Sequence, residues 1–176
     1  MNGDRFIRCR IPRGTEDYLP KETAKWRLVE ETFRKTFEKW GYREVRTPTF
    51  EFLDTLSTGI GKELEGSMFR FKDKKGRWLA LRAEMTTPIA RVAGTKLIPS
   101  PKPVRLYYIA NMFRYDEPQA GRKREFWHAG IELIGSGSAG ADAEVIALMM
   151  QSLKDIGLKN VTVRIGNVGV FKEAVR

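Results

Sequence analysis

The chain has 176 residues, of which 41% are hydrophobic and 11% aromatic, so it can bury a core and is not disordered over most of its length. A single cysteine, Cys9, excludes a disulfide scaffold, and with the single histidine, His128, it excludes a zinc site of the Cys/His type within the chain. The net charge of +10 is spread evenly, with 19 basic and 14 acidic side chains in residues 1–88 and 13 and 8 in residues 89–176, which excludes a basic tail.

The charge alone leaves two interpretations open. A mild, even excess of basic residues suits the binding of a polyanion or an anionic small molecule, and a solvated surface explains it equally well. No apolar run approaches the ~20 residues needed to span a bilayer, and the N-terminus has no signal-peptide core. We therefore expect a cytoplasmic protein without a membrane partner.

The first half of the chain predicts two helices, a short strand and a hairpin. One helical face is marked by five apolar residues spaced three or four apart: Trp26, Val29, Phe33, Phe37 and Trp40. This helix begins near residues 20–23 and ends at Gly41. After it we expect, in order, a strand over 44–47, a helix over 49–58, and strands over 68–71 and 77–82 around a turn at 73–76.

The centre of the chain predicts a capped helix and a long hairpin. The segment Thr86-Thr87-Pro88 offers an N-cap and a proline at the first position of a helix that runs to about Thr95. Beyond a proline-rich linker, residues 104–115 and 124–134 form two long strands, and the polar segment 116–123 joins them as a loop.

The last third predicts a helix, a strand and the start of another element. Asp142 is the expected cap of a helix that runs to Ile156, and a strand over 161–165 follows it. Residues 168–176 begin a further element. The order of elements favours an α+β fold, with a mostly antiparallel sheet flanked by helices.

The second long strand carries ionisable side chains on one face. Because alternate residues of a strand point to opposite faces, Arg124, His128 and Glu132 share a face. The opposite face is apolar and can pack on helices; it carries Trp127, Ala129, Ile131 and Leu133. If the hairpin pairs Arg114 with Arg124, then Arg114 and Tyr108 lie on the same side, which we call the polar face. A slip of one residue would separate them.

Two interpretations of the polar face remain. The charges could be cross-strand ion pairs on a hydrated sheet. Alternatively, because the neighbouring residues are small or flat, the face could be a site for a zwitterionic or phosphorylated ligand, with arginine for phosphate and a carboxylate for an ammonium group. His128 is either a structural histidine or a functional one, and no serine or cysteine nucleophile accompanies it.

Four segments carry a resemblance to one family. Residues 113–126 closely resemble motif 2 of the histidyl-tRNA synthetase family, which has a class II synthetase core. Residues 13–20 are similar to the N-terminal signature of that family, 41–51 to its dimer-forming motif 1, and 81–86 to the segment that holds the amino group of histidine. The motifs occur in order and cover essentially the whole chain.

The resemblance implies ATP-dependent activation of histidine and its transfer to tRNA(His). The implied ligands and partners are histidine, ATP with Mg²⁺ carried by the nucleotide, tRNA, and a second copy bound through the motif 1 region; no protein-bound zinc or other metal site is expected. Arg114 would be the catalytic residue, opposing the charge that develops at the α-phosphate. The ATP-binding residues would be Arg114, Asp116, Arg122 and Arg124. The histidine-binding residues would be Glu84, Thr86, His128 and Glu132.

The sequence also departs from the family pattern. Ala83 stands where a proline is usual, and His128 stands where a glutamine usually contacts the substrate. Motif 3 and the anticodon-binding domain have no counterpart, so residues 1–176 are expected to be a partial catalytic core, its N-terminal part. The alternative is a synthetase-like paralog, the regulatory subunit of ATP phosphoribosyltransferase in histidine biosynthesis, whose partner would be the phosphoribosyltransferase catalytic subunit. Residues 85–92, 109–114 and 167–171 resemble that subunit equally well.

Overall fold

The computed structural model of the protein describes residues 10–117 and 121–174, so Cys9 and the middle of the loop between the two long strands lie outside the described residues. Twelve elements occur in these two segments: α1 (Pro20–Lys39), β1 (Arg43–Glu44), β2 (Phe50–Phe52), α2 (Leu53–Ser57), α3 (Lys62–Gly66), β3 (Arg70–Lys72), β4 (Trp78–Leu81), α4 (Thr86–Lys96), β5 (Val104–Phe113), β6 (Glu125–Ile134), α5 (Ala139–Asp155) and α6 (Val168–Ala174). Among these helices, none is long and apolar enough to cross a membrane.

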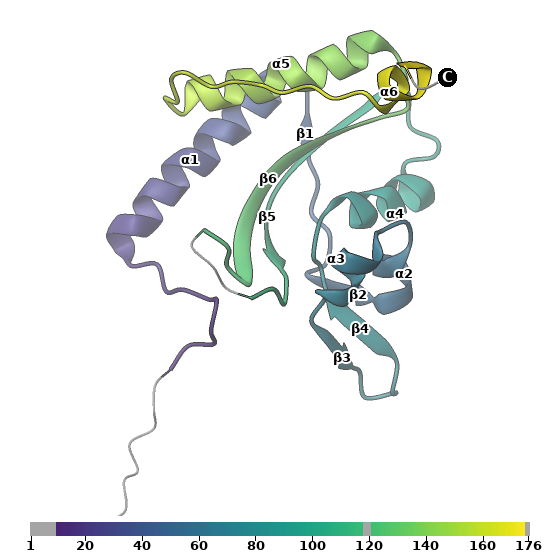
Figure 1. The fold of residues 1–176 in the computed structure, drawn as a ribbon. Coiled ribbons are helices and arrows are strands. Elements are labelled where there is room, and N and C mark those ends of the chain that lie inside the picture. Colours follow the sequence, from purple (N-terminus) through teal and green to yellow (C-terminus); the bar gives the residue numbers. More distant parts are fainter. Residues whose placement is uncertain (1–9, 118–120, 175–176) are drawn as a thin grey trace, which may run out of the picture.

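A long, curved hairpin of β5 and β6 lies at the centre of the fold (Figure 1). Its antiparallel register runs from Val104 opposite Ile134 to Phe113 opposite Glu125. The next pair continues this register, because the Arg114 amide donates to the Arg124 carbonyl at 2.9 Å. The pairing of Arg114 with Arg124 that the sequence analysis assumed is therefore the one present. β1 joins β5 in parallel, which completes a sheet of order β1-β5-β6.

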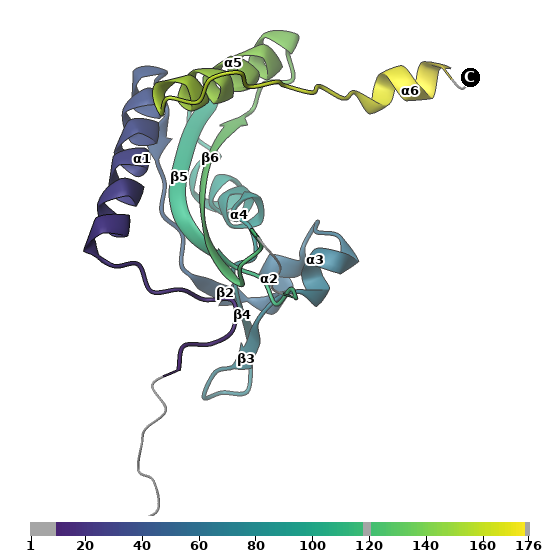
Figure 2. The same cartoon turned by 60° about the vertical axis from the view of Figure 1, so that its left-hand side comes forward.

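Helices cover both faces of this hairpin. Helices α1 and α5 lie on its convex side and α4 lies within its curve (Figure 2). The convex core consists of Phe37, Tyr42, Tyr107 and Leu148, and the residues packed against it include Ala129 and Ile131. The opposite core consists of Met85, Ile89, Leu106, Tyr108 and Met112. The two cores separate the alternate residues of β5 and β6, as the strand periodicity predicts.

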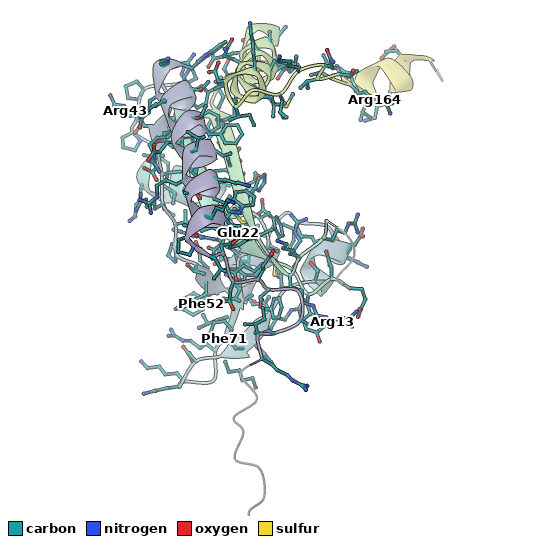
Figure 3. All side chains as sticks on the ribbon, turned by 90° about the vertical axis from the view of Figure 1, so that its left-hand side faces the viewer. Arg13, Glu22, Arg43, Phe52, Phe71 and Arg164 are labelled. Carbon is teal, nitrogen blue, oxygen red and sulfur yellow. The ribbon has the colours of Figure 1, made fainter. Side chains whose placement is uncertain are left out.

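A second, smaller sheet has the order β2-β4-β3 and is antiparallel throughout. One face packs on a third core, formed by Leu56, Met68, Ala80 and Ala83. The other face presents Phe50, Phe52 and Phe71, which are 50%, 43% and 38% exposed. The rings of Phe50 and Phe71 meet edge-on with centroids 5.7 Å apart, and Figure 3 labels Phe52 and Phe71 at the end of the molecule where this sheet lies. With the antiparallel β5–β6 pair, this sheet confirms the α+β, mostly antiparallel prediction.

Two predicted elements are wrong. The helix expected over 49–58 forms only from Leu53, because Phe50–Phe52 alternate exposed and buried side chains and pair with β4 as a strand. In that strand Glu51 is buried and accepts two hydrogen bonds from Arg91. The strand expected over 161–165 has no regular secondary structure, and no described strand pairs with it. Helix α3, by contrast, had no strong sequence signal between Gly61 and the hairpin.

Two predicted helix caps are also wrong. Thr86 is the first residue of α4, and the carboxylate of Glu84 accepts the first amide hydrogens instead. Asp142 lies within the first turn of α5, whose N-cap is Ser138 with its hydroxyl accepting from the Ala141 amide. In both places a side chain further upstream accepts amide hydrogens of the first turn, so the helix begins at or before the predicted cap.

Candidate ligand-binding site on the long hairpin

The start of α4 meets the polar face of the hairpin at Glu132. The Glu84 carboxylate accepts from the Thr86 amide at 2.6 Å and from the Thr87 amide at 2.8 Å. Because these bonds fix the first turn, the Thr86 hydroxyl is placed to donate to Glu132 Oε1 at 3.0 Å. The structure thus brings Glu84, Thr86 and Glu132 together, three of the four residues predicted to bind histidine.

Two carboxylates therefore share one partly buried location. Burial raises the pKa of Glu132, the hydrogen bond from Thr86 opposes that rise, and the nearby charge of Glu84 adds to it. A raised pKa means that the contacts of the ionised Glu132 carboxylate do not fully offset the cost of burying its charge. A bound cation would offset the rest of that cost, so this end of the polar face is suited to an ammonium group.

Tyr108 forms the middle of the polar face. Its ring lies directly over Gly130, where a Cβ atom would be only 2.3 Å from the hydroxyl oxygen and 2.4 Å from Cζ. His128, the fourth predicted histidine-binding residue, packs edge-on against this ring with centroids 5.5 Å apart. Burial of Tyr108 and the charges of Glu132 and Glu84 raise the pKa of its hydroxyl, which stays protonated as a possible donor. The small residue at position 130 is thus required by Tyr108.

Arg114 lies at the opposite end of the same face. Its Nε donates to the Ala83 carbonyl at 2.9 Å, and its guanidinium carbon lies 5.2 Å from the centre of the Phe126 ring. Desolvation lowers the pKa of His128, the charge of Arg114 lowers it further, and Glu84 partly opposes both. His128 therefore lies between a fixed cation and the carboxylate pair, and its neutral form is favoured.

Beyond Arg114 the face opens into a pocket of about 710 Å³. Three of the four residues predicted to bind ATP line it: Arg114, Asp116 and Arg122. Phe126, Lys123 and Tyr18 also line it, and a volume of this size is typical of small-molecule sites. The fourth predicted residue, Arg124, is not among the lining residues. Its guanidinium stacks on Tyr115 at 4.0 Å, and its Nε donates to the Asp116 carbonyl at 3.1 Å.

Sequence reasoning missed several residues of the site. Phe126 and the Ala83 carbonyl both orient Arg114, and the N-terminal residue Tyr18 reaches the pocket from far away in the sequence. Tyr108 was not missed, because strand alternation already places it on the polar face, and the register puts it opposite Gly130.

Comparison with known proteins supports the interpretation of these motifs. A family model described as histidyl-tRNA synthetase matches residues 14–176, which includes every residue of the site. The chain belongs to the histidyl-tRNA synthetase family. It is 50% identical over 165 residues to a histidine–tRNA ligase of Archaeoglobus fulgidus and 49% identical over 162 residues to an ATP phosphoribosyltransferase regulatory subunit of Moorella thermoacetica. Both names predicted from the motifs thus occur among its relatives.

Solved structures agree with the family assignment and the class II synthetase-like fold. A Bacillus halodurans protein titled as an ATP phosphoribosyltransferase regulatory subunit/histidyl-tRNA synthetase superposes with a TM-score of 0.78 at 34% identity, over 91% of this chain and 40% of that one. The histidyl-tRNA synthetase of S. aureus gives 0.72 at 36% identity, over 85% and 35%. The two sequence relatives are covered over 40% and 42% of their lengths, against 94% and 92% of this chain. The chain therefore spans about two-fifths of the relatives that it matches.

Proposed function

We propose that this chain forms part of a histidine–tRNA ligase-like catalytic core and binds both histidine and ATP. One observation carries the proposal: Thr86 joins Glu132 to the start of α4, so that two carboxylates face one end of a polar surface whose other end holds Arg114. An amino acid has the matching charges, since its ammonium group suits Glu84 and Glu132 and its carboxylate extends toward the arginine.

Arg114 is suited to the activation step. In that step a carboxylate oxygen of histidine attacks the α-phosphorus of ATP, the bond to the bridging oxygen breaks, and pyrophosphate leaves. The Ala83 carbonyl and the Phe126 ring fix the side chain through Nε and one guanidinium face, and its terminal nitrogens have no hydrogen-bond partner among the described residues. They can therefore donate to phosphate oxygens on which negative charge develops.

The neighbouring pocket suits the nucleotide. Arg114 and Arg122 supply cations on its lining, and Asp116 supplies an acceptor. We place the triphosphate there, with Mg²⁺ carried by the nucleotide, and we assign Arg124 to holding the loop. Because the loop carries its cations close to solvent, we also propose that it receives the acceptor end of tRNA.

A second copy of the chain is the proposed partner at the motif 1 region. The exposed face of the β2-β4-β3 sheet presents Phe50, Phe52 and Phe71, and a second copy would cover these rings. Since charging of tRNA takes place where translation does, we propose a cytoplasmic location.

The regulatory subunit remains the second candidate, because a relative of that name is 49% identical to this chain. In that case the partner would be a phosphoribosyltransferase catalytic subunit and no tRNA would be charged. Histidine-dependent exchange of labelled pyrophosphate into ATP, measured on the complete protein of which this core would form part, separates the two. A ligase exchanges the label; absence of exchange, together with co-purification of a phosphoribosyltransferase, would replace the first proposal by the second.

The histidine site has its own test. Glu132→Gln keeps an acceptor for Thr86 and removes the charge, so calorimetry should show histidine binding weakened by about tenfold or more. Glu144→Gln is the matched control, since Glu144 pairs with Arg105 away from the polar face. Equal affinities of the two variants would remove Glu132 from the site.

A further inference from the structure

The segment 12–18, here called the N-terminal strap, runs along the base of the loop that joins β5 to β6. Figure 2 shows the chain before α1 passing the lower end of the hairpin. The Gly14 carbonyl accepts from the Arg124 amide at 2.8 Å and from the Glu125 amide at 3.3 Å. On the same side, Lys123 pairs with Glu16 and donates to the Tyr18 hydroxyl. The strap is thus attached to the chain as it enters β6.

Gly14 allows the strap to approach this closely. Its φ of +86° lies in the left-handed region, which side chains other than glycine rarely adopt. A Cβ atom at position 14 would lie 2.8 Å from Cγ of Arg124 and 3.1 Å from Cδ. A larger residue would therefore push away the stem of Arg124, even if the backbone kept its conformation.

The position of Arg124 in turn fixes the loop. Its stem lies against Gly14, and its guanidinium stacks on Tyr115 and donates to the carbonyl of Asp116. Arg124 therefore crosses from the β6 end of the loop to the β5 end and ties the two together. Asp116 and Arg122, which line the pocket, lie between these tied ends.

We propose that Gly14 is a positioning residue that acts through Arg124. By seating the stem of Arg124, it holds both ends of the loop together and keeps Asp116 and Arg122 at the pocket. The identity of the ligand rests on the proposed function, whereas the link from Gly14 to Arg124 does not. A further contact of the strap, an ion pair of Arg13 with Glu117 at 3.6 Å, is highly exposed and adds little.

Gly14→Ala tests this link, with Gly76→Ala as the matched control. Gly76 has φ +79°, so alanine meets the same backbone strain there, but no atom lies within 4 Å of its Cβ position. The Nε–H signal of Arg124, assigned with Arg124→Lys, reports its stacking on Tyr115 by NMR. We expect it to move toward the position of free arginine in Gly14→Ala and to stay in place in Gly76→Ala. An unmoved signal in Gly14→Ala overturns the proposal.

The affinity for ATP gives a second readout. We expect Gly14→Ala to weaken ATP binding by about tenfold and to add no further loss in an Arg124→Ala background, because both changes disturb one unit. The same loss in both backgrounds overturns the proposal. If the unaltered protein binds no ATP, the proposed function fails, and the NMR signal still decides the role of Gly14.

Folding of the variants is checked as well. Should Gly14→Ala fail to fold, the double variant with Arg124→Ala lacks Cγ and Cδ, which lie at 2.8 and 3.1 Å, and keeps only the Cβ of residue 124 at 3.0 Å, so it is expected to recover at least part of the lost stability. Failure of the double variant to recover also overturns the proposal.

Discussion

Replacement of Gly130 by alanine tests the packing that builds the polar face. The added Cβ would lie 2.3 Å from the Tyr108 hydroxyl oxygen and 2.9 Å from Cε1, whereas ordinary van der Waals contact begins at 3.4 Å. The ring would have to retreat by about 1 Å at its tip. It is only 4% exposed and packs in a core with Met85 and Met112, so it has little space into which to move.

We expect this overpacking to cost about 2–3 kcal/mol of unfolding free energy. With a slope of about 2 kcal/mol per molar urea, the midpoint of unfolding should fall by roughly 1–1.5 M. Gly137→Ala is the control, because nothing lies within 4 Å of its Cβ position and its φ is not in the left-handed region. If the two variants differ by less than about 0.5 kcal/mol, Tyr108 does not lie over Gly130 and the described face is wrong.

Three further predictions concern titration and burial. His128 is the single histidine, so NMR follows the titration of its imidazole without overlap. We expect the pKa of His128 to lie below the ordinary 6.5 and to rise in Arg114→Ala. A pKa at or above 6.5 in the unaltered protein would contradict the described geometry. Folding raises the pKa of Glu132, so the free energy of unfolding should fall as pH rises from about 4.5 and this carboxyl ionises. Glu132→Gln should therefore become more stable relative to the unaltered protein over that range. A constant difference between their urea midpoints from about pH 4 to 8 would count against this prediction. Arg82→Met should lower the free energy of unfolding by about 3 kcal/mol or more, because Arg82 is 6% exposed and makes four hydrogen bonds to buried or partly buried acceptors. Arg46→Met is the control: its side chain is 80% exposed, so the loss in the same urea titration should be under about 1 kcal/mol.

The long hairpin was predictable because strand alternation there is strict, and alternation alone places the ionisable residues of β6 on one face. The register was an assumption, and the assumed pairing of Arg114 with Arg124 is the one that the structure has. Helix α1 was also predictable, since its apolar residues keep a helical period up to Gly41. The spacing of residues within each element was enough to predict these strands and this helix.

The wrong predictions share a different physical origin. A short segment forms a strand only where another strand pairs with it. Residues 50–52 pair with β4, whereas no described strand pairs with residues 161–165. The start of α4 depends on Glu84, because its carboxylate accepts the amide hydrogens of Thr86 and Thr87. Tertiary contacts thus decided the two strand cases, whereas a nearby side chain decided where α4 begins.

The site shows the same division. The polar face followed from strand periodicity, but the orientation of Arg114 follows from the Ala83 carbonyl and from Phe126, which no spacing rule relates to it. Arg124 shares the face of Arg114 by periodicity, yet Tyr115 and Asp116 hold it away from the pocket. Charge type and face were predictable, whereas the partner of each charge was not.

We propose above that Arg114 and the carboxylate pair form one site for ATP and histidine. The decisive measurement is a calorimetric titration with ATP in the presence of histidine, compared between the unaltered protein and Arg114→Ala. We expect the unaltered protein to bind and the variant to bind at least about tenfold more weakly. An unchanged affinity for ATP and histidine in Arg114→Ala would contradict it.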